Sequence, residues 1–311
     1  MLSPVLITGA TGFIGAHLAG ALVDAGASVV ALARPGSARR RLQLLGKAVT
    51  IVEADVGDAA AVRAVLTRAK PQLLFHLAAR GVRPAERDRA EMLRINVLGT
   101  ETIVEEAARC GVERLVLCGG SSEYGHVDAP MRESLRPAPV TAYGASKAAA
   151  TLLACQAARD LSLALVVLRP FTVYGPLEPG HRLIPTAIRA ALGHLPLPLT
   201  GPGLRHDYVY VADVVEAFVA AGGRSLPAGE IINVGTGVES TNEEVVAEIE
   251  RQTGARIDVQ LGAYAAHPSD HGRWVADTTK ARALLGVTPR YPLARGIAAM
   301  AAFARAHGTD W

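Results

Sequence analysis

A tyrosine and a lysine four residues apart could work together as an acid and a base. In Tyr143-Gly144-Ala145-Ser146-Lys147, the phenol and the ammonium group would lie one above the other on a helix face. The chain has 7 Tyr and only 4 Lys, so chance would give about 0.09 such pairs at this spacing. A nearby cation lowers the pKa of a phenol from about 10, as acid/base chemistry at a carbonyl or alcohol requires. The alternative is an exposed pair on a surface helix.

Three glycines spaced three residues apart follow a short apolar run. Gly9 would allow a tight turn, Gly12 would let a phosphate approach the backbone, and Gly15 would pack the next helix on the strand. The N-terminus of that helix would hold a pyrophosphate. The loop therefore predicts a bound dinucleotide, and the alternative is a βα turn without a ligand.

The second predicted strand ends in Arg34, where an NAD site would have an acid for the ribose 2′-hydroxyl. Arg34, with Ser37 and arginines 39–41 behind it, suits a 2′-phosphate, which favours NADP(H) over NAD(H). Since the chain contains 28 Arg, a merely solvated Arg34 is the alternative. Asp55, at the end of the third strand, could hold the adenine amino group or cap the following turn.

The N-terminal half alternates short apolar runs with alanine-rich segments, which is typical of βαβ units around a buried parallel sheet. The predicted strands cover residues 4–8, 28–33, 49–54, 72–77, 114–118 and 163–168. The predicted helices cover residues 12–24, 59–69, 90–110 and 143–160. Asp58 is a plausible N-cap, and Gly26 and Gly111 are plausible C-terminal stops.

After Gly175, six prolines break the chain into loops around a short helical pattern at 181–192. Sheet-like or helical texture returns at 209–219 and 231–234, and further helices are expected at 243–252 and 278–285. We predict an α/β fold, a Rossmann-type doubly wound parallel sheet with a smaller α+β substrate-binding region. The cofactor domain would comprise residues 1–175 plus about 206–237, and the substrate region residues 176–205 and 238–311.

Composition excludes several classes of protein. Half of the 311 residues are hydrophobic and 20% are charged, which excludes a disordered or fibrous chain. The net charge of +3 comes from dispersed arginines, so nucleic acid is not an expected partner. Cys110, Cys118 and Cys155 show no disulfide or metal spacing, so no metal site and a cytoplasmic location are expected. No apolar stretch is long enough to span a membrane, and the loop at Gly9 leaves no room for a signal peptide.

Further motifs occur at residues 75–79, 95–100, 121–125, 169–176, 206–211 and 232–237. With the glycine loop and Tyr143/Lys147, they make nearly the whole chain resemble the extended short-chain dehydrogenase/reductases that modify nucleotide sugars. The resemblance implies that Tyr143 donates or accepts the proton, and that Lys147 lowers its pKa and holds the nicotinamide ribose. A Ser or Thr after the fifth strand would bind the substrate oxygen. Gly120 occupies that position here, so Ser121 or Ser122 would substitute, and Ser121 is favoured.

The resemblance extends to a set of binding residues. The predicted cofactor-binding residues are Gly9, Thr11, Gly12, Phe13, Ile14, Gly15, Arg34, Ser37, Asp55, Val56, Leu77, Ala78, Ala79, Asn96, Cys118, Tyr143, Lys147, Pro170, Thr172 and Val173. The predicted substrate-binding residues are Arg80, Ser121, Ser122, Glu123, Tyr143, Thr172, Arg205, His206 and Arg273. Of these, Arg205, His206 and Arg273 are candidates for the substrate diphosphate, and simple surface placement is the alternative. A homodimer through residues 90–110 and 143–160 is also implied.

The family's reactions are C4 epimerisation, 4,6-dehydration and reduction of a 4-keto sugar. Its dehydratases have an acid two positions before the Tyr of the Tyr-Gly pair, where this chain has Ser122. Glu123-Tyr124-Gly125 and Arg34 instead resemble the reductases of 4-keto-6-deoxy nucleotide sugars. We therefore expect hydride transfer from NADPH to C4, with Tyr143 as proton donor. The alternatives are a 4-epimerase or 4,6-dehydratase with retained NAD(P), or an NADP-binding regulatory protein without catalysis, which the missing hydroxyl at Gly120 suggests.

Overall fold

The computed structural model describes residues 2–46, 48–81, 86, 88–263 and 273–309. Within them, seven parallel strands form the central sheet in the order β3-β2-β1-β4-β5-β6-β11. The strands are β1 (Val5–Thr8), β2 (Val29–Ala33), β3 (Thr50–Glu53), β4 (Leu73–His76), β5 (Arg114–Cys118), β6 (Leu165–Pro170) and β11 (Glu230–Val234). The Rossmann-type fold is confirmed, and the first six strands lie within two residues of their predicted bounds.

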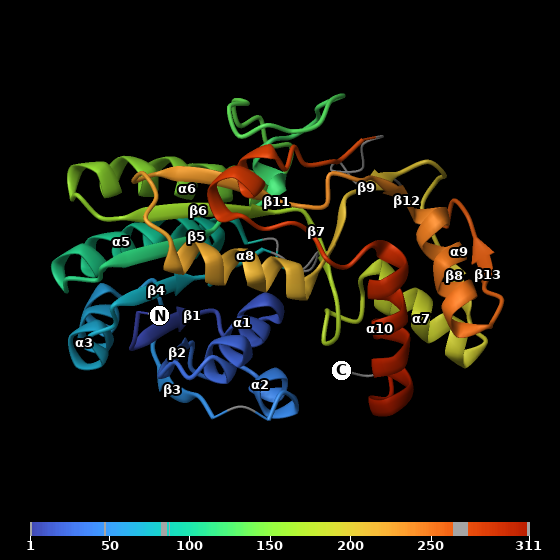
Figure 1. Cartoon of the computed structure of the whole chain (residues 1–311), viewed down its shortest axis with the longest axis horizontal. Coiled ribbons are helices and arrows are strands. Elements are labelled where there is room, and N and C mark those ends of the chain that lie inside the picture. The colour runs from blue at the N-terminus through green and yellow to red at the C-terminus, as the bar shows by residue number, and fades with distance from the viewer. Residues whose placement is uncertain (1, 47, 82–85, 87, 264–272, 310–311) are drawn as a thin grey trace.

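Helices cover both faces of this sheet (Figure 1). One face carries α1 (Phe13–Asp24) and α8 (Val211–Gly223), with the short α2 (Arg40–Leu44) beside α1. The other carries α3 (Ala59–Ala69), α5 (Gly99–Arg109) and α6 (Ala142–Asp160). Each face is sealed by its own apolar core, which explains why the strand sequences are hydrophobic throughout.

Capping residues mark where these helices begin and end, at the positions that the sequence predicts. The Asp58 carboxylate accepts a hydrogen bond of 3.1 Å from the Ala61 amide, which caps α3. Gly26 and Gly111 follow α1 and α5 with φ of 82° and 72°, values that a residue with a Cβ rarely adopts. The predicted cap and stops are therefore confirmed.

The single helix predicted at 90–110 is wrong in its middle. The chain forms α4 (Arg89–Met92), then a π-helical segment (Leu93–Leu98), and then α5. The wider π turn holds Asn96 in the interior, where it is 1% exposed. Such turns occur frequently at functional sites.

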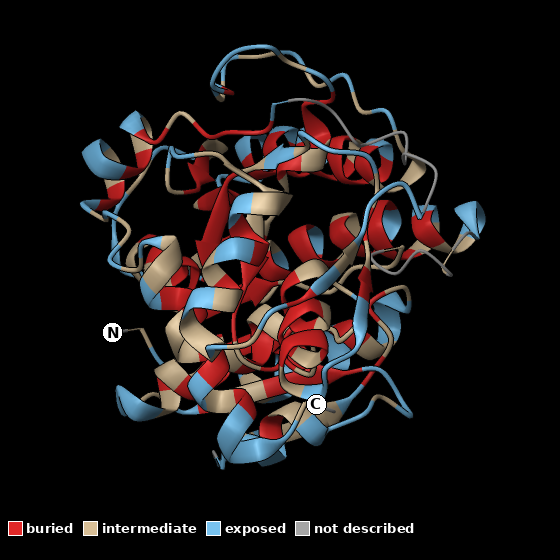
Figure 2. Ribbon diagram, turned by 90° about the vertical axis from the view of Figure 1, so that its right-hand side faces the viewer, coloured by how far each residue is buried: buried red, intermediate tan, exposed pale blue. Residues whose placement is uncertain are grey.

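A second group of elements packs beside the sheet, at the right of Figure 1. It consists of α7 (Leu183–Gly193), α9 (Asn242–Thr253) and α10 (Leu293–His307), which share one apolar cluster. Figure 2, viewed from this side, shows the buried residues inside the group. The helix α10 was not predicted, and the pattern at 278–285 forms a π-helical turn (Ala281–Leu285).

Short strand pairs complete the described part of the fold. The pairs are β7 (Thr172–Tyr174) with β10 (Tyr208–Tyr210), β9 (Arg205–His206) with β12 (Ser240–Thr241), and β8 (Pro196–Pro198) with β13 (Asp258–Gln260). The domain boundaries given above stay a prediction. Because Ala281 and Leu285 belong to the α1/α8 core, we propose that the turn containing them belongs with the cofactor domain.

No helix in the described part of the chain is both long and apolar enough to cross a membrane. Within the same residues, no cluster of three or more His, Cys, Asp or Glu side chains has the arrangement of a metal site. The three cysteines are free thiols.

Candidate active site

The glycine loop between β1 and α1 has the geometry that a dinucleotide requires. Gly9 has a φ of 72°, and a Cβ there would lie 2.6 Å from the Leu77 carbonyl carbon. A Cβ on Gly15 would lie 2.2 Å from the Gly9 oxygen. Gly12 is the N-cap of α1 and provides no side-chain cap, so the first amides of the helix stay open to a phosphate. The loop therefore fits the pyrophosphate of a dinucleotide.

A buried histidine is hydrogen-bonded to the end of β1, directly before this loop. His76 Nδ1 lies 2.6 Å from Thr8 Oγ1, and its Nε2 lies 3.1 Å from Thr100 Oγ1. Thr100 donates its only hydroxyl proton to the Asn96 carbonyl, so Nε2 carries the ring proton and Thr8 donates to Nδ1. Burial lowers the pKa of His76 to about 3, with a smaller effect from the Lys147 charge, so the ring is neutral and joins β1, β4 and α5.

Asn96 joins the π-helical segment to the start of α6. Its Oδ1 accepts from the Arg80 amide at 2.7 Å, and its Nδ2 donates to the Ser146 hydroxyl at 2.8 Å. Ser146 in turn donates to the Tyr143 carbonyl at 2.8 Å. Asn96 therefore positions the turn that carries the predicted acid.

Tyr143 and Lys147 lie on the first turns of α6, which Thr141 caps by accepting from the Gly144 amide at 3.0 Å. Lys147 is 4% exposed and donates to the Cys118 carbonyl at 2.6 Å, at the end of β5. A Cβ on Gly144 would lie 2.4 Å from the Ser122 carbonyl oxygen. This close approach brings Tyr143 beside the turn that contains Ser121 and Ser122.

The pKa of Tyr143 differs from the prediction. Burial raises this pKa, and the neighbouring Cys118 and Glu123 raise it further, while the Arg182 charge lowers it. The predicted lowering of the Tyr143 pKa is thus wrong for this structure, in which the Lys147 ammonium group is bound by the Cys118 carbonyl. The phenol therefore holds its proton at neutral pH, as the start of a carbonyl reduction requires, although the raised pKa does not make it a stronger acid.

The sequence did not single out Arg182, although its charge acts on Tyr143. It precedes α7 and forms an ion pair of 3.0 Å with Glu178. No local motif marks this arginine, because only the fold brings the start of α7 toward α6.

The turn Ser121–Glu123 follows β5. Ser121 is 8% exposed, and its hydroxyl accepts a hydrogen bond of 2.9 Å from the indole of Trp274. Ser122 is partly exposed. At Gly120, a Cβ would meet only the Ser122 hydroxyl, at 3.6 Å, so this backbone has room for the family's usual hydroxyl residue.

Glu123 is used inside the protein. Its carboxylate is fully buried and accepts from the Gly120 amide at 2.9 Å, from Thr151 at 3.1 Å and from Arg169 at 2.9 Å. Burial raises the pKa of this carboxyl, and the Arg169 and Lys147 charges oppose that effect. The substrate contact predicted for Glu123 needs correction, because these partners occupy both oxygens and leave it a role in positioning the turn.

The predicted adenosine side lies at the ends of β2 and β3. Arg34 is exposed there, and its charge helps to lower the pKa of Asp55, which the Arg94 hydrogen bond lowers most. Asp55 accepts from Arg94 Nη2 and from the Gly57 amide, both at 2.8 Å. The Gly57 contact is the turn-capping alternative left open by the sequence. The Ser37 amide donates a hydrogen bond of 3.0 Å to the Arg34 carbonyl.

The remaining predicted cofactor residues follow the carboxyl ends of the strands, where doubly wound sheets bind their ligands. They are Thr11, Phe13 and Ile14 after β1, Val56 after β3, Leu77, Ala78 and Ala79 after β4, and Pro170, Thr172 and Val173 at and after the end of β6.

The residues predicted to bind the substrate diphosphate lie close together around Glu239. Arg205 and Arg273 both pair with Glu239, at 3.6 Å and 3.2 Å. His206 lies between Arg205 and the buried Asp207, and its ring packs edge-on against Tyr208. The acid that gathers the two arginines was not found from the sequence, because Glu239 lies far from both in the chain.

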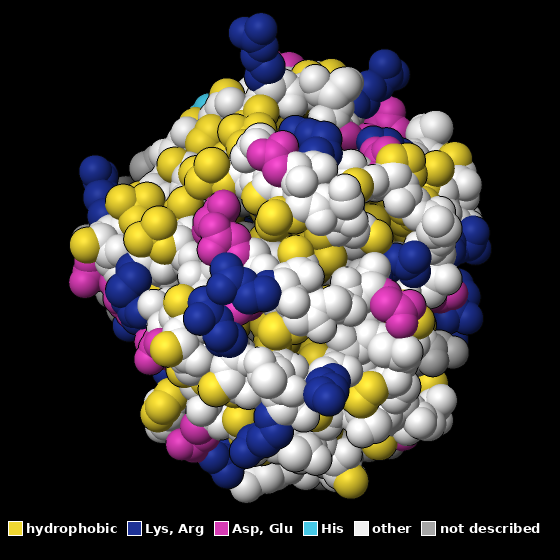
Figure 3. All heavy atoms as spheres, turned by 90° about the vertical axis from the view of Figure 1, so that its left-hand side faces the viewer, with side chains coloured by type: hydrophobic (Ala, Val, Ile, Leu, Met, Phe, Trp, Pro, Cys, Tyr) yellow, Lys and Arg dark blue, Asp and Glu magenta, His cyan; other side chains and the backbone are white. Residues whose placement is uncertain are grey.

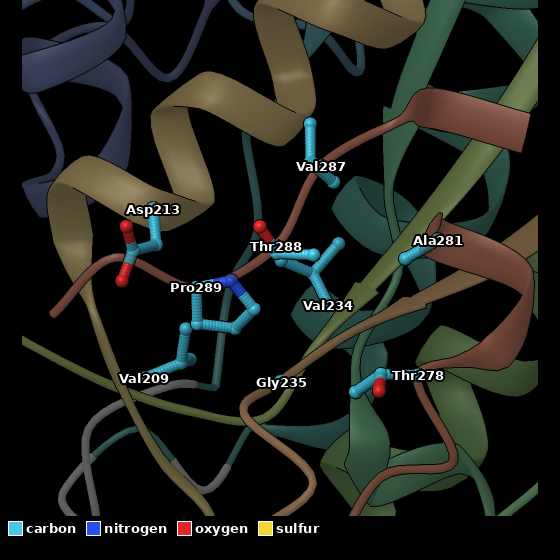
Figure 4. Close-up of a pocket in the computed structure, with 9 residues that line it drawn as sticks. All are labelled: Val209, Asp213, Val234, Gly235, Thr278, Ala281, Val287, Thr288 and Pro289. Carbon is cyan, nitrogen blue, oxygen red and sulfur yellow. The ribbon is translucent and has the colours of Figure 1, made fainter. Parts of the chain in front are cut away.

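The cavity in Figure 4 is a separate feature. It lies beside α8, near Asp213 and the segment Val287 to Pro289, and its volume of about 20 Å³ suits one water molecule. Asp213 accepts from the Arg290 and Tyr291 amides at 3.0 Å and 3.1 Å. This cavity is too small for a sugar and carries no catalytic assignment.

Comparison with known proteins identifies the family. Residues 5–235 match the NAD dependent epimerase/dehydratase family. The chain belongs to this family. It is thus an NAD(P)-dependent, oxidoreductase-type enzyme of the extended short-chain dehydrogenase/reductase type, in agreement with the resemblance that the motifs carry.

Relatives within the family catalyse different reactions. The UDP-glucose 4-epimerase of Mycolicibacterium smegmatis is 34% identical and the alignment covers 96% of this chain and 98% of that protein. The dTDP-6-deoxy-L-talose 4-dehydrogenase (NAD(P)(+)) of Kitasatospora kifunensis is 33% identical, with coverage of 94% and 93%. The structure of MoeE5 in complex with UDP-glucose and NAD is 34% identical, with a TM-score of 0.88 and coverage of 98% and 99%. Membership therefore establishes a nucleotide-sugar epimerase, dehydratase or dehydrogenase, and the site must decide among them.

Proposed function

We propose that the protein is an NADP(H)-dependent reductase of nucleoside-diphosphate 4-keto-6-deoxy sugars. The observation that carries this proposal is the state of Glu123, whose carboxylate is sealed by Arg169 and Thr151. A 4,6-dehydratase needs a carboxylate free to remove a proton from the sugar, and Ser122 stands where the family's dehydratases have one. The turn beside Tyr143 instead offers hydroxyl groups, which suits reduction of a ketone.

The residues of the chain would act as follows. When bound, the cofactor supplies the hydride that adds to C4 of the keto sugar. Tyr143, whose phenol is protonated at neutral pH, donates a proton to the developing C4 alkoxide. Ser121 donates a hydrogen bond to the same oxygen. Lys147 would hold the nicotinamide ribose, and Arg205 and Arg273 the diphosphate.

Arg34 supports NADPH over NADH as the reductant. It is exposed at the end of β2, where the family's tight NAD binders carry an acid. The Arg34→Ala variant is expected to raise the KM for NADPH about tenfold or more and to change that for NADH little. Arg68→Ala, an exposed arginine on α3, is the control. Equal wild-type affinity for the two cofactors, or tighter NADH binding, would contradict this preference.

The proposed reaction is tested with purified protein, NADPH or NADH, and a panel of UDP-, dTDP- and GDP-linked 4-keto-6-deoxy sugars. We expect loss of absorbance at the reduced-nicotinamide band, faster with NADPH, and formation of a C4 alcohol. A parallel reaction contains UDP-glucose or dTDP-glucose and no added cofactor. Conversion only in that reaction would replace the proposal by a 4-epimerase, which the Mycolicibacterium relative favours, or by a dehydratase. No conversion in either reaction would indicate a regulatory protein.

We also propose that the enzyme is a cytoplasmic homodimer joined through α5 and α6. Leu98 and Leu152 on or beside these helices are 61% and 57% exposed, with Leu93 and Leu153 at 53% and 44%. Figure 3 shows the end of the molecule where α5 and α6 lie, with hydrophobic side chains gathered toward the upper left. Sedimentation should give twice the mass of the 32.4 kDa chain, and Leu152→Glu should give the monomer.

A further inference from the structure

Trp274 contacts the candidate catalytic turn from a distant part of the sequence. Its side chain is 6% exposed and packs with Tyr124, Met131 and Phe171. Its indole N–H donates to Ser121 Oγ at 2.9 Å across 153 residues of chain. An indole can only donate, and a buried indole N–H needs such a partner.

This contact leaves the Ser121 proton available. A hydroxyl has one proton and two lone pairs, and the indole uses one of the lone pairs. Within the described ranges, the Ser121 hydroxyl donates to no other residue, and the neighbouring Ser122 hydroxyl has no hydrogen-bond partner. Of the two serines, Ser121 is therefore the one whose oxygen is held in a defined orientation beside Tyr143.

Trp274 is itself held firmly. Its carbonyl accepts from the Asp207 amide at 2.7 Å, and the next residue, Val275, accepts from the Met131 amide at 2.8 Å. The buried Asp207 carboxylate accepts from the Ala276 amide at 3.2 Å and from the Thr236 and Gly237 amides. These hydrogen bonds fix the backbone that carries the indole, as a group that orients a catalytic hydroxyl requires.

We propose that Trp274 is a positioning residue for Ser121. Its N–H holds the Ser121 oxygen so that the hydroxyl proton points to the C4 oxygen of the sugar beside Tyr143. Because a hydroxyl that accepts a hydrogen bond becomes a better donor, the indole also strengthens that contact. The inference rests on the proposed function, since it assigns the substrate hydrogen bond of that reaction to Ser121. It also explains how a chain with glycine at position 120 keeps a substrate hydroxyl.

A double-mutant cycle tests this role. Trp274→Phe keeps an aromatic ring in the apolar cluster and removes the N–H together with the five-membered ring of the indole. We expect it to lower kcat about fivefold to tenfold and to change KM little. The same substitution made in Ser121→Ala should have no further effect, whereas in Ser122→Ala, the matched control, it should retain its full effect. An equal loss of kcat in the Ser121→Ala background, or no loss in any background, would overturn the proposal.

A second measurement does not depend on the reaction. The chain has two tryptophans, so the indole N–H signal missing from the NMR spectrum of Trp274→Phe belongs to Trp274. This signal should move in Ser121→Ala and stay in place in Ser122→Ala. An unmoved signal in Ser121→Ala would overturn the inference whatever the reaction is. A moved signal in a protein that reduces no 4-keto sugar would support the contact and refute only the proposed reaction.

Discussion

The catalytic side and the diphosphate side of the candidate site are built differently. On the catalytic side, Asn96, Ser121, Glu123 and Lys147 are at most 8% exposed and are held by hydrogen bonds between separate elements. On the diphosphate side, the Arg205 and Arg273 side chains are 50% and 45% exposed and share one carboxylate.

This difference separates two tasks. Groups fixed in a dry environment need no rearrangement when charge develops, so they can stabilise a transition state. Exposed arginines are screened by water and salt and can follow a flexible substrate. Substitutions on the catalytic side should therefore lower kcat or stability, and those on the diphosphate side should raise KM.

The largest effect is expected at Tyr143. Tyr143→Phe removes the proton donor and should lower kcat for a 4-keto sugar by about 10² to 10⁴, with little change in KM. Tyr291→Phe, which removes the hydroxyl group of a tyrosine whose ring stacks on Tyr210 away from this site, is the control in the same steady-state assay. A Tyr143→Phe enzyme with the kcat of the wild type would contradict the assignment of Tyr143 as the proton donor.

The next effect concerns the pair beneath the turn. Arg169 and Glu123 are 1% and 0% exposed, so Arg169→Met leaves a buried carboxylate without its cation. The free energy of unfolding in urea should fall by about 3 to 5 kcal/mol, and adding Glu123→Gln should restore much of it. Arg251→Met breaks the exposed pair with Glu248 and should cost at most about 1 kcal/mol. A similar loss of unfolding free energy in Arg169→Met and Arg251→Met would contradict the larger contribution expected of the buried ion pair.

A smaller effect is expected from acid. The pKa of His76 is about 3 in the fold and 6.5 ordinarily, so between these values the unfolded chain binds the proton and the folded chain does not. Stability from this group is therefore lost as pH falls below 6.5, by about 1 to 2 kcal/mol between pH 7 and 5. Urea unfolding of His76→Gln should lack this loss. His194→Asn, at an exposed histidine, should keep it, and an unchanged slope in His76→Gln would contradict the prediction.

The smallest effect is expected on the diphosphate side. Arg273→Gln and Arg205→Gln should each raise the KM for the nucleotide sugar about threefold to tenfold and leave kcat within about twofold. Added salt should reduce the difference from the wild type. Arg256→Gln, at a strongly exposed arginine that follows α9, serves as the control. A fall in kcat without a change in KM would contradict the proposal that these arginines act in substrate binding and not in catalysis.

The sequence predicts the features that depend on neighbouring residues. Strands with continuous apolar residues, the Asp58 cap and the glycine turn each follow from local periodicity or backbone geometry, and all are present. The helix α10 was missed because alanine occurs on both of its faces, which leaves Ile297 and Met300 as a weak apolar stripe. The π-helical segment at Leu93–Leu98 was missed because its periodicity differs little from that of an α-helix.

Contacts between distant residues could not be predicted. Arg169 lies 46 residues from Glu123, and Trp274 lies 153 residues from Ser121, so no spacing connects them. The same limit explains the Tyr143 pKa, because the sequence shows the lysine but not the burial of the phenol or the carbonyl that binds the lysine.

Transfer of an isotope from cofactor to sugar tests the central claim most directly. The enzyme is given a 4-keto-6-deoxy nucleotide sugar and NADPH with deuterium at nicotinamide C4, in separate 4R and 4S preparations. The account predicts one deuterium at C4 of the product from one of the two preparations, with one NADP⁺ formed per sugar. A product free of deuterium from both preparations, or interconversion of C4 epimers without NADP⁺, would contradict it.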